Sequence, residues 1–241
     1  IPIKSSRLLV RGYNMSEFIS HEVEPLPRKE SKFGNTEKIL QIMREGEVVL
    51  LGNIEEVVGG IHSHANEVNI ASLPSCHVND VLGARVQKGN DSILCVFKPY
   101  KGESSETKKK TQVNCFYSRE CAAYMVSEHF DFDVVPPTLI REVNGEVGSL
   151  QLFLDHDYYL NFSNLPGEKI DEAELSSDWH TIAILDWILA NCERHWDNMM
   201  VDVENPSSIA AIDHGIIFSS YNYYEMALRG PSLQLTHDNK T

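Results

Sequence analysis

Long hydrophobic runs and closely spaced cysteines are both missing from this sequence. No apolar stretch approaches the roughly 20 residues that a membrane-spanning helix needs. The five cysteines are scattered, and no two of them have the short spacing typical of a zinc or redox site. Free thiols indicate a reducing compartment. We therefore expect an intracellular protein, most simply a cytoplasmic one, with export into a host cell as an alternative.

Positive charge is also scarce. Lys and Arg number 21 against 35 Asp and Glu, which gives a formal net charge of −14. This balance argues against a surface dedicated to nucleic acid or to an anionic membrane, because both bind clustered Lys and Arg. The basic cluster Lys108-Lys109-Lys110 lies in the polar stretch 101–111, which we expect to be a solvated loop.

The composition is that of an ordinary globular protein, with 42% apolar and 23% charged residues in a chain of 241. This length allows one large domain or two closely packed lobes. Periodicity and turn residues predict an α+β order, with helices over 36–44, over 113–130 and after a cap at 176–178, and strands over 47–51, 55–58, 68–72, 81–86, 92–97, 139–143, 149–154, 199–203 and 209–212. We expect a leading segment at 1–46, a sheet lobe with one helix at 47–154, and a mainly helical lobe with a hairpin at 155–241.

The last predicted hairpin carries the first half of a candidate site. It would bring Asn198 and Asp213 side by side at one end of its two strands. An amide oxygen and a carboxylate are hard donors suited to Mg²⁺, which takes one or two protein carboxylates together with water and substrate phosphates. The loop before Asn198 adds Glu193, whose carboxylate could orient a nucleophilic hydroxyl, with Arg194 and His195 as hydrogen-bonding supports.

A lysine and a glutamate in the sheet lobe supply the second half of the candidate site. Lys98 follows an apolar strand, on the same face as Leu94 and Val96. An ammonium group there is costly unless it finds anions. Glu120 in the next helix is a natural partner, and phosphoryl transfer uses a Lys–Glu pair of this kind to position phosphates.

Taken singly, these residues have simpler interpretations. Lys98 could form a surface ion pair, Glu120 could be an ordinary carboxylate on a helix surface, and Asp213 could be a turn residue. His195 would more often satisfy a buried backbone group than do chemistry. Asp186, in the helix before the loop, is expected to anchor that loop. Only the joint order of the motifs favours a catalytic site.

Five motifs follow one another along the chain: Val96-Phe97-Lys98-Pro99, Arg119-Glu120-Cys121-Ala122-Ala123-Tyr124, Val134-Val135-Pro136-Pro137-Thr138 with Gly148-Ser149-Leu150-Gln151-Leu152-Phe153, Glu193-Arg194-His195-Trp196-Asp197-Asn198, and Ile212-Asp213-His214-Gly215. In this order they resemble the phosphatidylinositol 3-/4-kinase-like superfamily of atypical kinases, most closely its uncharacterised microbial branch. The resemblance implies a bilobal, protein-kinase-like fold, with an antiparallel-sheet N-lobe that carries one helix. The C-lobe would be mainly helical, and its last helices would be missing here.

The same resemblance implies that ATP and Mg²⁺ are the ligands of the site. Lys98 would contact the ATP phosphates, Glu120 would fix Lys98, and Asn198 and Asp213 would bind Mg²⁺. The other implied contacts are the adenine hinge, at Gln151, Leu152, Phe153 and Leu154, and the loop over the phosphates, at Ser63 and Asn66. The protein would then transfer the γ-phosphoryl group of ATP to a hydroxyl group.

One residue departs from the superfamily's pattern. Glu193 stands where aspartate is usual, and its carboxylate is one methylene farther from the backbone. A displacement of about 1 Å can cost on the order of 100-fold in rate. Two alternatives to an active kinase therefore stay open: a pseudokinase that acts as a nucleotide-gated binding module, and an enzyme that transfers AMP. For the acceptor, the net charge of −14 favours a protein or a small-molecule hydroxyl over a lipid.

Overall fold

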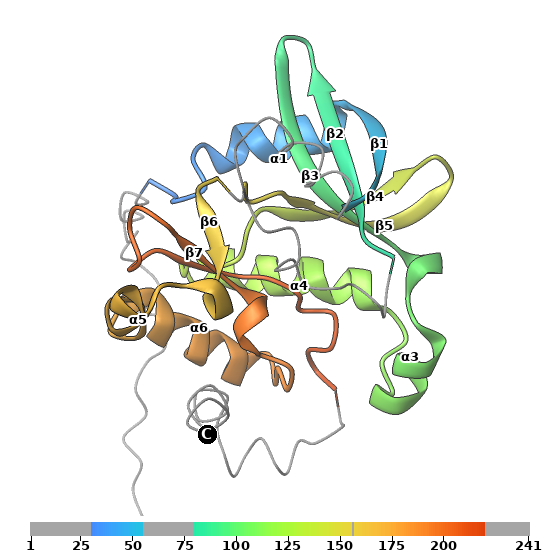
Figure 1. Cartoon of the computed structure of the whole chain (residues 1–241). Helices are drawn as coiled ribbons and strands as arrows, with labels where there is room; N and C mark the ends of the chain where they lie inside the picture. The colour runs from blue at the N-terminus through green and yellow to red at the C-terminus, as the bar shows by residue number, and fades with distance from the viewer. Residues whose placement is uncertain (1–29, 55–79, 156, 220–241) are drawn as a thin grey trace, which may run out of the picture.

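Two antiparallel sheets organise the residues that the computed structural model describes, which are 30–54, 80–155 and 157–219 (Figure 1). One has five strands in the order β1-β2-β3-β5-β4, and the other has three in the order β6-β7-β8. The strands are β1 (Glu47–Asn53), β2 (Leu82–Lys88), β3 (Asp91–Pro99), β4 (Thr138–Val143), β5 (Glu146–Leu152), β6 (Tyr159–Asn161), β7 (Met199–Asp202) and β8 (Ile209–Ala211). The helices are α1 (Thr36–Glu45), α3 (Ser105–Thr111), α4 (Phe116–His129), α5 (Gly167–Glu174) and α6 (Ser177–Ile188), with 3₁₀ turns at η3 (Tyr100–Gly102), η4 (Phe162–Asn164) and η5 (Trp196–Asn198).

Helix α1 packs on β2, β3 and β4 of the five-stranded sheet. It begins where the side chain of Asn35 accepts a hydrogen bond from the Lys38 N–H, and Gly46 is its C-cap, close to the predicted end of the helix at 44. A side chain at Gly46 would place its Cβ only 2.7 Å from the Ile42 oxygen, so glycine lets the chain turn directly into β1. The buried Met43 anchors the helix to the hydrophobic core of this sheet.

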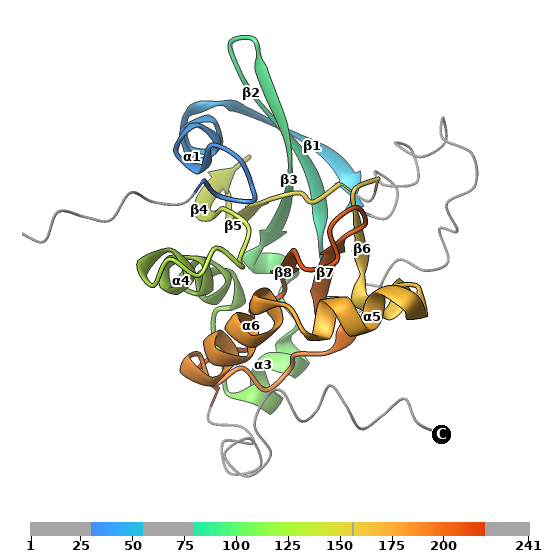
Figure 2. The ribbon, with the colours of Figure 1, turned by 90° about the vertical axis from the view of Figure 1, so that its left-hand side faces the viewer.

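Helix α4 belongs to both halves of the molecule. It packs on β4 and β5, while its Ala123 and Tyr124 lie in a second hydrophobic core together with Leu185 of α6 and Val201 of β7. Figure 2 shows α4 between the five-stranded sheet and α6. The sequence predicted that this helix begins at 113, but it begins at Phe116. Because α4 packs on the first sheet and lies in the core beside the second, it couples the positions of the two sheets.

The polar stretch 101–111 is not a loop, so this prediction is wrong. It forms the end of η3 and the short helix α3, whose N-cap Ser104 accepts a hydrogen bond from the Thr107 N–H at 3.2 Å. Lys108 is held from both sides, since its Nζ lies 2.8 Å from the Glu103 carboxylate and 3.9 Å from the centre of the Tyr100 ring. These contacts of Lys108 join it to residues five and eight positions earlier, and the polarity of the stretch alone does not indicate them.

The predicted C-terminal hairpin is present as β7 and β8, which pair antiparallel. The strand β6, which the sequence did not indicate, adds to the outer side of β7. The expected strands at 55–58 and 68–72 lie outside the described residues, and the division into 47–154 and 155–241 stays a prediction. Every helix in the described ranges is too short or too polar to cross a bilayer.

Candidate active site

The ammonium group of Lys98 joins the end of β3 to two carboxylates. Its Nζ lies 2.5 Å from Glu120 Oε1 on α4 and 2.9 Å from Asp213 Oδ1, which follows β8. The predicted pair of Lys98 and Glu120 is therefore present, and Asp213 completes a cluster of three. Residues 98 and 213 are 115 positions apart in the sequence, so only the folded chain brings them together.

The two carboxylates of this cluster differ in their surroundings. The side chain of Glu120 is 2% exposed, and that of Asp213 is 52% exposed. Burial raises the pKa of Glu120, although Lys98 opposes this change. The charge of Lys98 lowers the pKa of Asp213. Burial works against the charged form of Lys98, but the two carboxylates outweigh it and raise the pKa of Lys98. One ammonium thus faces two carboxylates, so the cluster keeps one negative charge that a further cation would balance.

Glu120 also holds the segment that carries Asp213. Its Oε2 accepts a hydrogen bond from the backbone N–H of His214 at 2.8 Å. A side chain at Gly215 would place its Cβ 3.1 Å from Phe116 Cβ, so glycine allows the segment to approach α4 this closely. Asp213 itself has a φ of +58°, a left-handed conformation that costs on the order of 1–3 kcal/mol in a residue other than glycine. The contacts with α4 hold this strained residue toward Lys98.

Arg194 is buried and fixes the loop that precedes β7. Its Nε and Nη2 donate to the two oxygens of Asp186 at 2.9 and 3.1 Å. Its Nη1 donates to the backbone oxygens of Asn198 and Ile212 at 2.6 and 2.8 Å. The guanidinium therefore ties α6 to both strands of the hairpin, which is a supporting position. Asp186 is the anchor of this loop, as the sequence predicted.

His214 is a site residue that the sequence analysis did not single out. Its Nε2 lies 2.8 Å from Nη2 of Arg194. Because arginine can only donate, Nε2 must accept, and the proton of the neutral ring sits on Nδ1. Burial lowers the pKa of His214 well below its usual value, which agrees with a neutral ring. The only signal in the sequence is its place between Asp213 and Gly215.

Asn198 lies at the base of the loop with its amide oriented by two contacts. Its Nδ2 donates to the Glu193 backbone oxygen at 3.1 Å and lies 3.1 Å from His195 Nε2. This leaves Oδ1 as the atom that can face a cation. The backbone oxygen of Asn198 accepts a hydrogen bond from Ile212 N–H at 3.0 Å, so the backbone at 198 adjoins the residue before Asp213, as the hairpin prediction requires.

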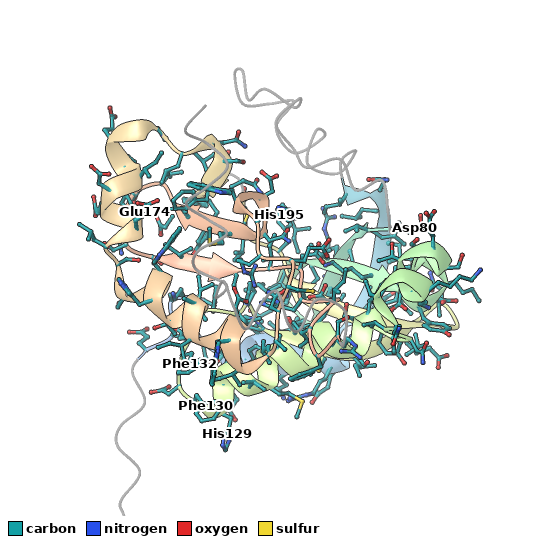
Figure 3. All side chains as sticks on the ribbon, turned by 90° about the horizontal axis from the view of Figure 1, so that it is seen from below. Asp80, His129, Phe130, Phe132, Glu174 and His195 are labelled. Carbon is teal, nitrogen blue, oxygen red and sulfur yellow. The ribbon has the colours of Figure 1, made fainter. Side chains whose placement is uncertain are left out.

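The remaining loop residues are more exposed. The side chains of Glu193 and His195 both reach solvent, and Figure 3 labels His195 on this loop. Asp197, which the sequence analysis left without a role, has Oδ2 3.8 Å from Nδ1 of His195 and accepts a hydrogen bond from Ser163. Its backbone oxygen accepts from Asn161 Nδ2 at 2.6 Å. These contacts from β6 and η4 hold the outer side of the loop.

The predicted hinge is closely integrated with the sheet. The N–H groups of Leu152 and Phe153 donate to the backbone oxygens of Pro137 and Leu94 at 2.9 and 3.0 Å. The buried side chain of Gln151 donates to Thr138 Oγ1 at 2.8 Å. Leu154 is buried in a small cluster between the two sheets. The backbone N–H groups of Leu152 and Phe153 are therefore already engaged by the sheet.

Both predicted phosphate-loop residues, Ser63 and Asn66, lie outside the described residues. Within the described ranges, no group of three or more His, Cys, Asp and Glu side chains is arranged to hold a metal ion. A pair formed by the Asn198 amide and the Asp213 carboxylate still fits Mg²⁺, because this ion takes few protein ligands and fills its shell with water and phosphate oxygens.

Comparison with known families decides where this arrangement belongs. The family described as "Phosphatidylinositol 3- and 4-kinase" matches residues 80–238. The chain is a member of this kinase family. The match includes Lys98, Glu120, Asn198 and Asp213 and begins after α1 and β1. The resemblance seen in the motifs is thereby confirmed, and the five-stranded antiparallel sheet with its helices agrees with the α+β fold expected for such a kinase.

Two plant members of the phosphatidylinositol 3- and 4-kinase family are similar to this chain. Phosphatidylinositol 4-kinase gamma 4 of Oryza sativa subsp. japonica is 28% identical over 216 residues, which cover 76% of this chain and 37% of the relative. Phosphatidylinositol 4-kinase gamma 4 of Arabidopsis thaliana is 31% identical over 135 residues, which cover 45% of this chain and 22% of the relative. In each case the similarity spans less than half of the relative's length.

Proposed function

We propose that this chain is the catalytic part of an ATP- and Mg²⁺-dependent kinase that transfers the γ-phosphoryl group to a hydroxyl acceptor. The observation that carries the proposal is the meeting of Lys98 from β3 and Asp213 from the end of β8, with 2.9 Å between Nζ and Oδ1. In phosphoryl transfer, a positioned ammonium and a metal-binding carboxylate must act on the same phosphate chain.

The roles of the residues follow from their positions. The Lys98 ammonium would neutralise phosphate oxygens, while Glu120 holds it in place from α4. Asn198 Oδ1 and the Asp213 carboxylate are the two hard oxygen donors for Mg²⁺. When bound, this ion would neutralise the charge on the transferring phosphoryl group. Arg194 would keep these two donors in register through the backbone oxygens of residues 198 and 212.

Glu193 is the candidate for orienting the acceptor hydroxyl. Its side chain is exposed on the loop that ends at Asn198, within the same short segment as the metal donors. A carboxylate in this position can accept the proton of the attacking hydroxyl. The extra methylene relative to aspartate is the feature that favours a pseudokinase as the second candidate function.

Nucleotide binding tests the first step of the proposal. We expect ATP with Mg²⁺ to raise the thermal midpoint of the purified chain, and Asp213→Asn to remove this shift. Asp91→Asn is the matched control, because Asp91 lies at the exposed β2–β3 turn and pairs with Lys38. A wild-type chain that gains no thermal stability from ATP and Mg²⁺ would rule out both the kinase and the pseudokinase.

Turnover separates the two candidates. An active kinase releases ADP from ATP, and Asp213→Asn reduces the rate at least 100-fold, the scale of removing one charge-stabilising group. A pseudokinase binds nucleotide but stays inactive both as wild type and as Glu193→Asp. If Glu193→Asp turns over faster than wild type, the longer side chain limits an enzyme that is otherwise competent.

Two classes of acceptor are considered for the proposed reaction: an inositol lipid, and a protein or small-molecule hydroxyl. The two relatives are named as phosphatidylinositol kinases, which favours an inositol lipid, whereas the charge of −14 favours a protein or a small molecule. Incubation with labelled ATP and either phosphatidylinositol vesicles or a protein extract separates these acceptors. The intact mass of a modified protein distinguishes phosphate, about 80 Da, from AMP, about 329 Da.

A further inference from the structure

A short segment directly before α1 connects the two sheets of the molecule. Residues 31–33 contact α6, β8 and the linker that follows α4, whereas α1, only a few residues later, packs on the five-stranded sheet. Figure 1 shows this segment in blue beside the hairpin of β7 and β8. It precedes residue 80, where the family match begins.

We propose that residues 31–33 form a strap that positions the hinge residue Leu154 and, through it, the adenine side of the nucleotide site. Lys32 and Phe33 are positioning residues in this proposal, since neither contacts the catalytic cluster. The consequence for ATP rests on the proposed function, but the effect on the hinge itself does not.

The first anchor of the strap is the side chain of Lys32. Its Nζ forms an ion pair with Asp178 in the first turn of α6 and donates to the Ile209 backbone oxygen at 3.1 Å. Asp178 in turn accepts a hydrogen bond from the Ile209 N–H at 2.9 Å. The side chains of Lys32 and Asp178 are 15% and 19% exposed. This pair is therefore more shielded from water than an ordinary surface ion pair, and it holds the strap at the junction of α6 and β8.

The second anchor is Asp133 in the linker between α4 and β4. Its Oδ1 accepts from Ser31 Oγ at 2.6 Å, and its Oδ2 accepts from the Lys32 N–H at 2.8 Å. Asp133 has a φ of +53° and follows Phe132, which Figure 3 labels near the end of α4. One carboxylate in a left-handed turn thus receives both a side chain and a backbone group of the strap.

The contact with the hinge is made by Phe33. It is 9% exposed and lies in a cluster with Leu154 of the hinge, Met200 of β7 and Ala210 of β8. Ile212, which precedes Asp213, packs against the same cluster. The Phe33 ring therefore packs with Leu154, which lies in the connection between the two sheets. It also packs on β7 and β8, the strands next to the proposed metal donors.

The short connection between the strap and α1 limits how far the two sheets can move relative to each other at this point. Between Phe33 and the start of α1 at Thr36, the chain can span at most about 3.3–3.6 Å per residue. A change in the angle between the sheets must therefore break the Lys32 ion pair or pull Phe33 out of its cluster. Because a packed cluster resists both, the strap restrains the hinge in one arrangement.

The test compares Phe33→Ala and Lys32→Ala with their conservative forms, Phe33→Leu and Lys32→Arg. We expect Phe33→Ala to speed hydrogen exchange of the amides at 152–154. It should also raise the KM for ATP about tenfold, or about 1.4 kcal/mol, while kcat changes less than threefold. Lys32→Ala should act in the same direction but less strongly, and both conservative forms should stay within about twofold of wild type.

Lys38→Ala is the matched control. Lys38 is a lysine of α1 that pairs with Asp91 in an exposed contact at 2.7 Å, within the five-stranded half of the molecule, and it should leave exchange at 152–154 unchanged. Unchanged exchange at 152–154 in Phe33→Ala would overturn the strap. If Phe33→Ala does not fold, Lys32→Ala takes its place, and unchanged exchange at 152–154 in Lys32→Ala would then overturn the strap. If the wild type binds no ATP, the proposed function fails, while the exchange measurement still decides the strap.

Discussion

Lys98 carries more of the site than its single charge suggests. Within the described ranges, its ammonium is the only cation that pairs with the buried Glu120 carboxylate, because the His214 ring 3.9 Å away is neutral. The second carboxylate, on Asp213, is half exposed and can be solvated. Lys98 therefore contributes both to the stability of the fold, through Glu120, and to the proposed chemistry of the site, through Asp213.

We predict that Lys98→Met destabilises the protein by about 3–5 kcal/mol, because it leaves the Glu120 carboxylate buried without its cation. The double variant Lys98→Met/Glu120→Gln should recover a large part of this loss, since the neutral amide no longer needs a cation. Urea unfolding measures both. If the single and the double variant have equal stability, Glu120 is not held as an ionised partner.

Arg194 differs from Lys98 in that all of its described contacts are structural. We predict that Arg194→Lys lowers the free energy of unfolding by about 1–3 kcal/mol, because an ammonium cannot reproduce the fork and leaves buried acceptors without donors. Arg85→Lys on the exposed side of β2 is the matched control and should change stability by less than about 0.5 kcal/mol. Equal losses in both variants would contradict the anchoring role.

At the scale of elements, α6 depends on one cap. The Ser176 side chain accepts a hydrogen bond from the Trp179 N–H at 3.1 Å, and the same helix carries Asp186, the anchor of the catalytic loop. We predict that Ser176→Ala costs about 1 kcal/mol, measured by thermal or urea unfolding, whereas Ser176→Asp, which can still cap, stays close to wild type. A loss in Ser176→Asp as large as in Ser176→Ala would show that the cap is not the cause.

Elements with local signals could be predicted from the sequence. The helix expected at 36–44, the strands expected at 81–86, 92–97 and 139–143, and the C-terminal hairpin all follow from periodicity and turn residues, and all are present. The pairing of Lys98 with Glu120 was also predicted, because a strand that ends in lysine needs an anion.

Elements that depend on distant contacts could not be predicted. Strand β6 forms by pairing with β7, residues 159–161 with 200–202. The role of His214 could not be predicted for the same reason, since its partner Arg194 is 20 positions away. The residues that neighbour each partner in the sequence give no indication of these pairings.

At the scale of the whole molecule, α4 packs on the five-stranded sheet and contributes to the core beside the second sheet, and the strap joins the two halves further. We predict a single unfolding transition. The three tryptophans, Trp179, Trp187 and Trp196, all lie in or beside the half that contains α6 and the hairpin, so tryptophan fluorescence reports that half, and far-UV circular dichroism reports both. The two signals should change at the same urea concentration. Separate midpoints would show that α4 and the strap do not couple the halves.

The unequal exposure of the two acids beside Lys98 bears on which form of a nucleotide the protein accepts. Glu120 is a buried residue of α4 and keeps its contact with Lys98, whereas Asp213 is half exposed and can release the ammonium. A bare triphosphate would have to displace Asp213 and then lie next to its carboxylate. A triphosphate that arrives together with a divalent ion gives the displaced acid a new counter-charge. We therefore expect the charged cluster around Lys98 to bind metal-complexed nucleotide more tightly than metal-free nucleotide, already at the binding step.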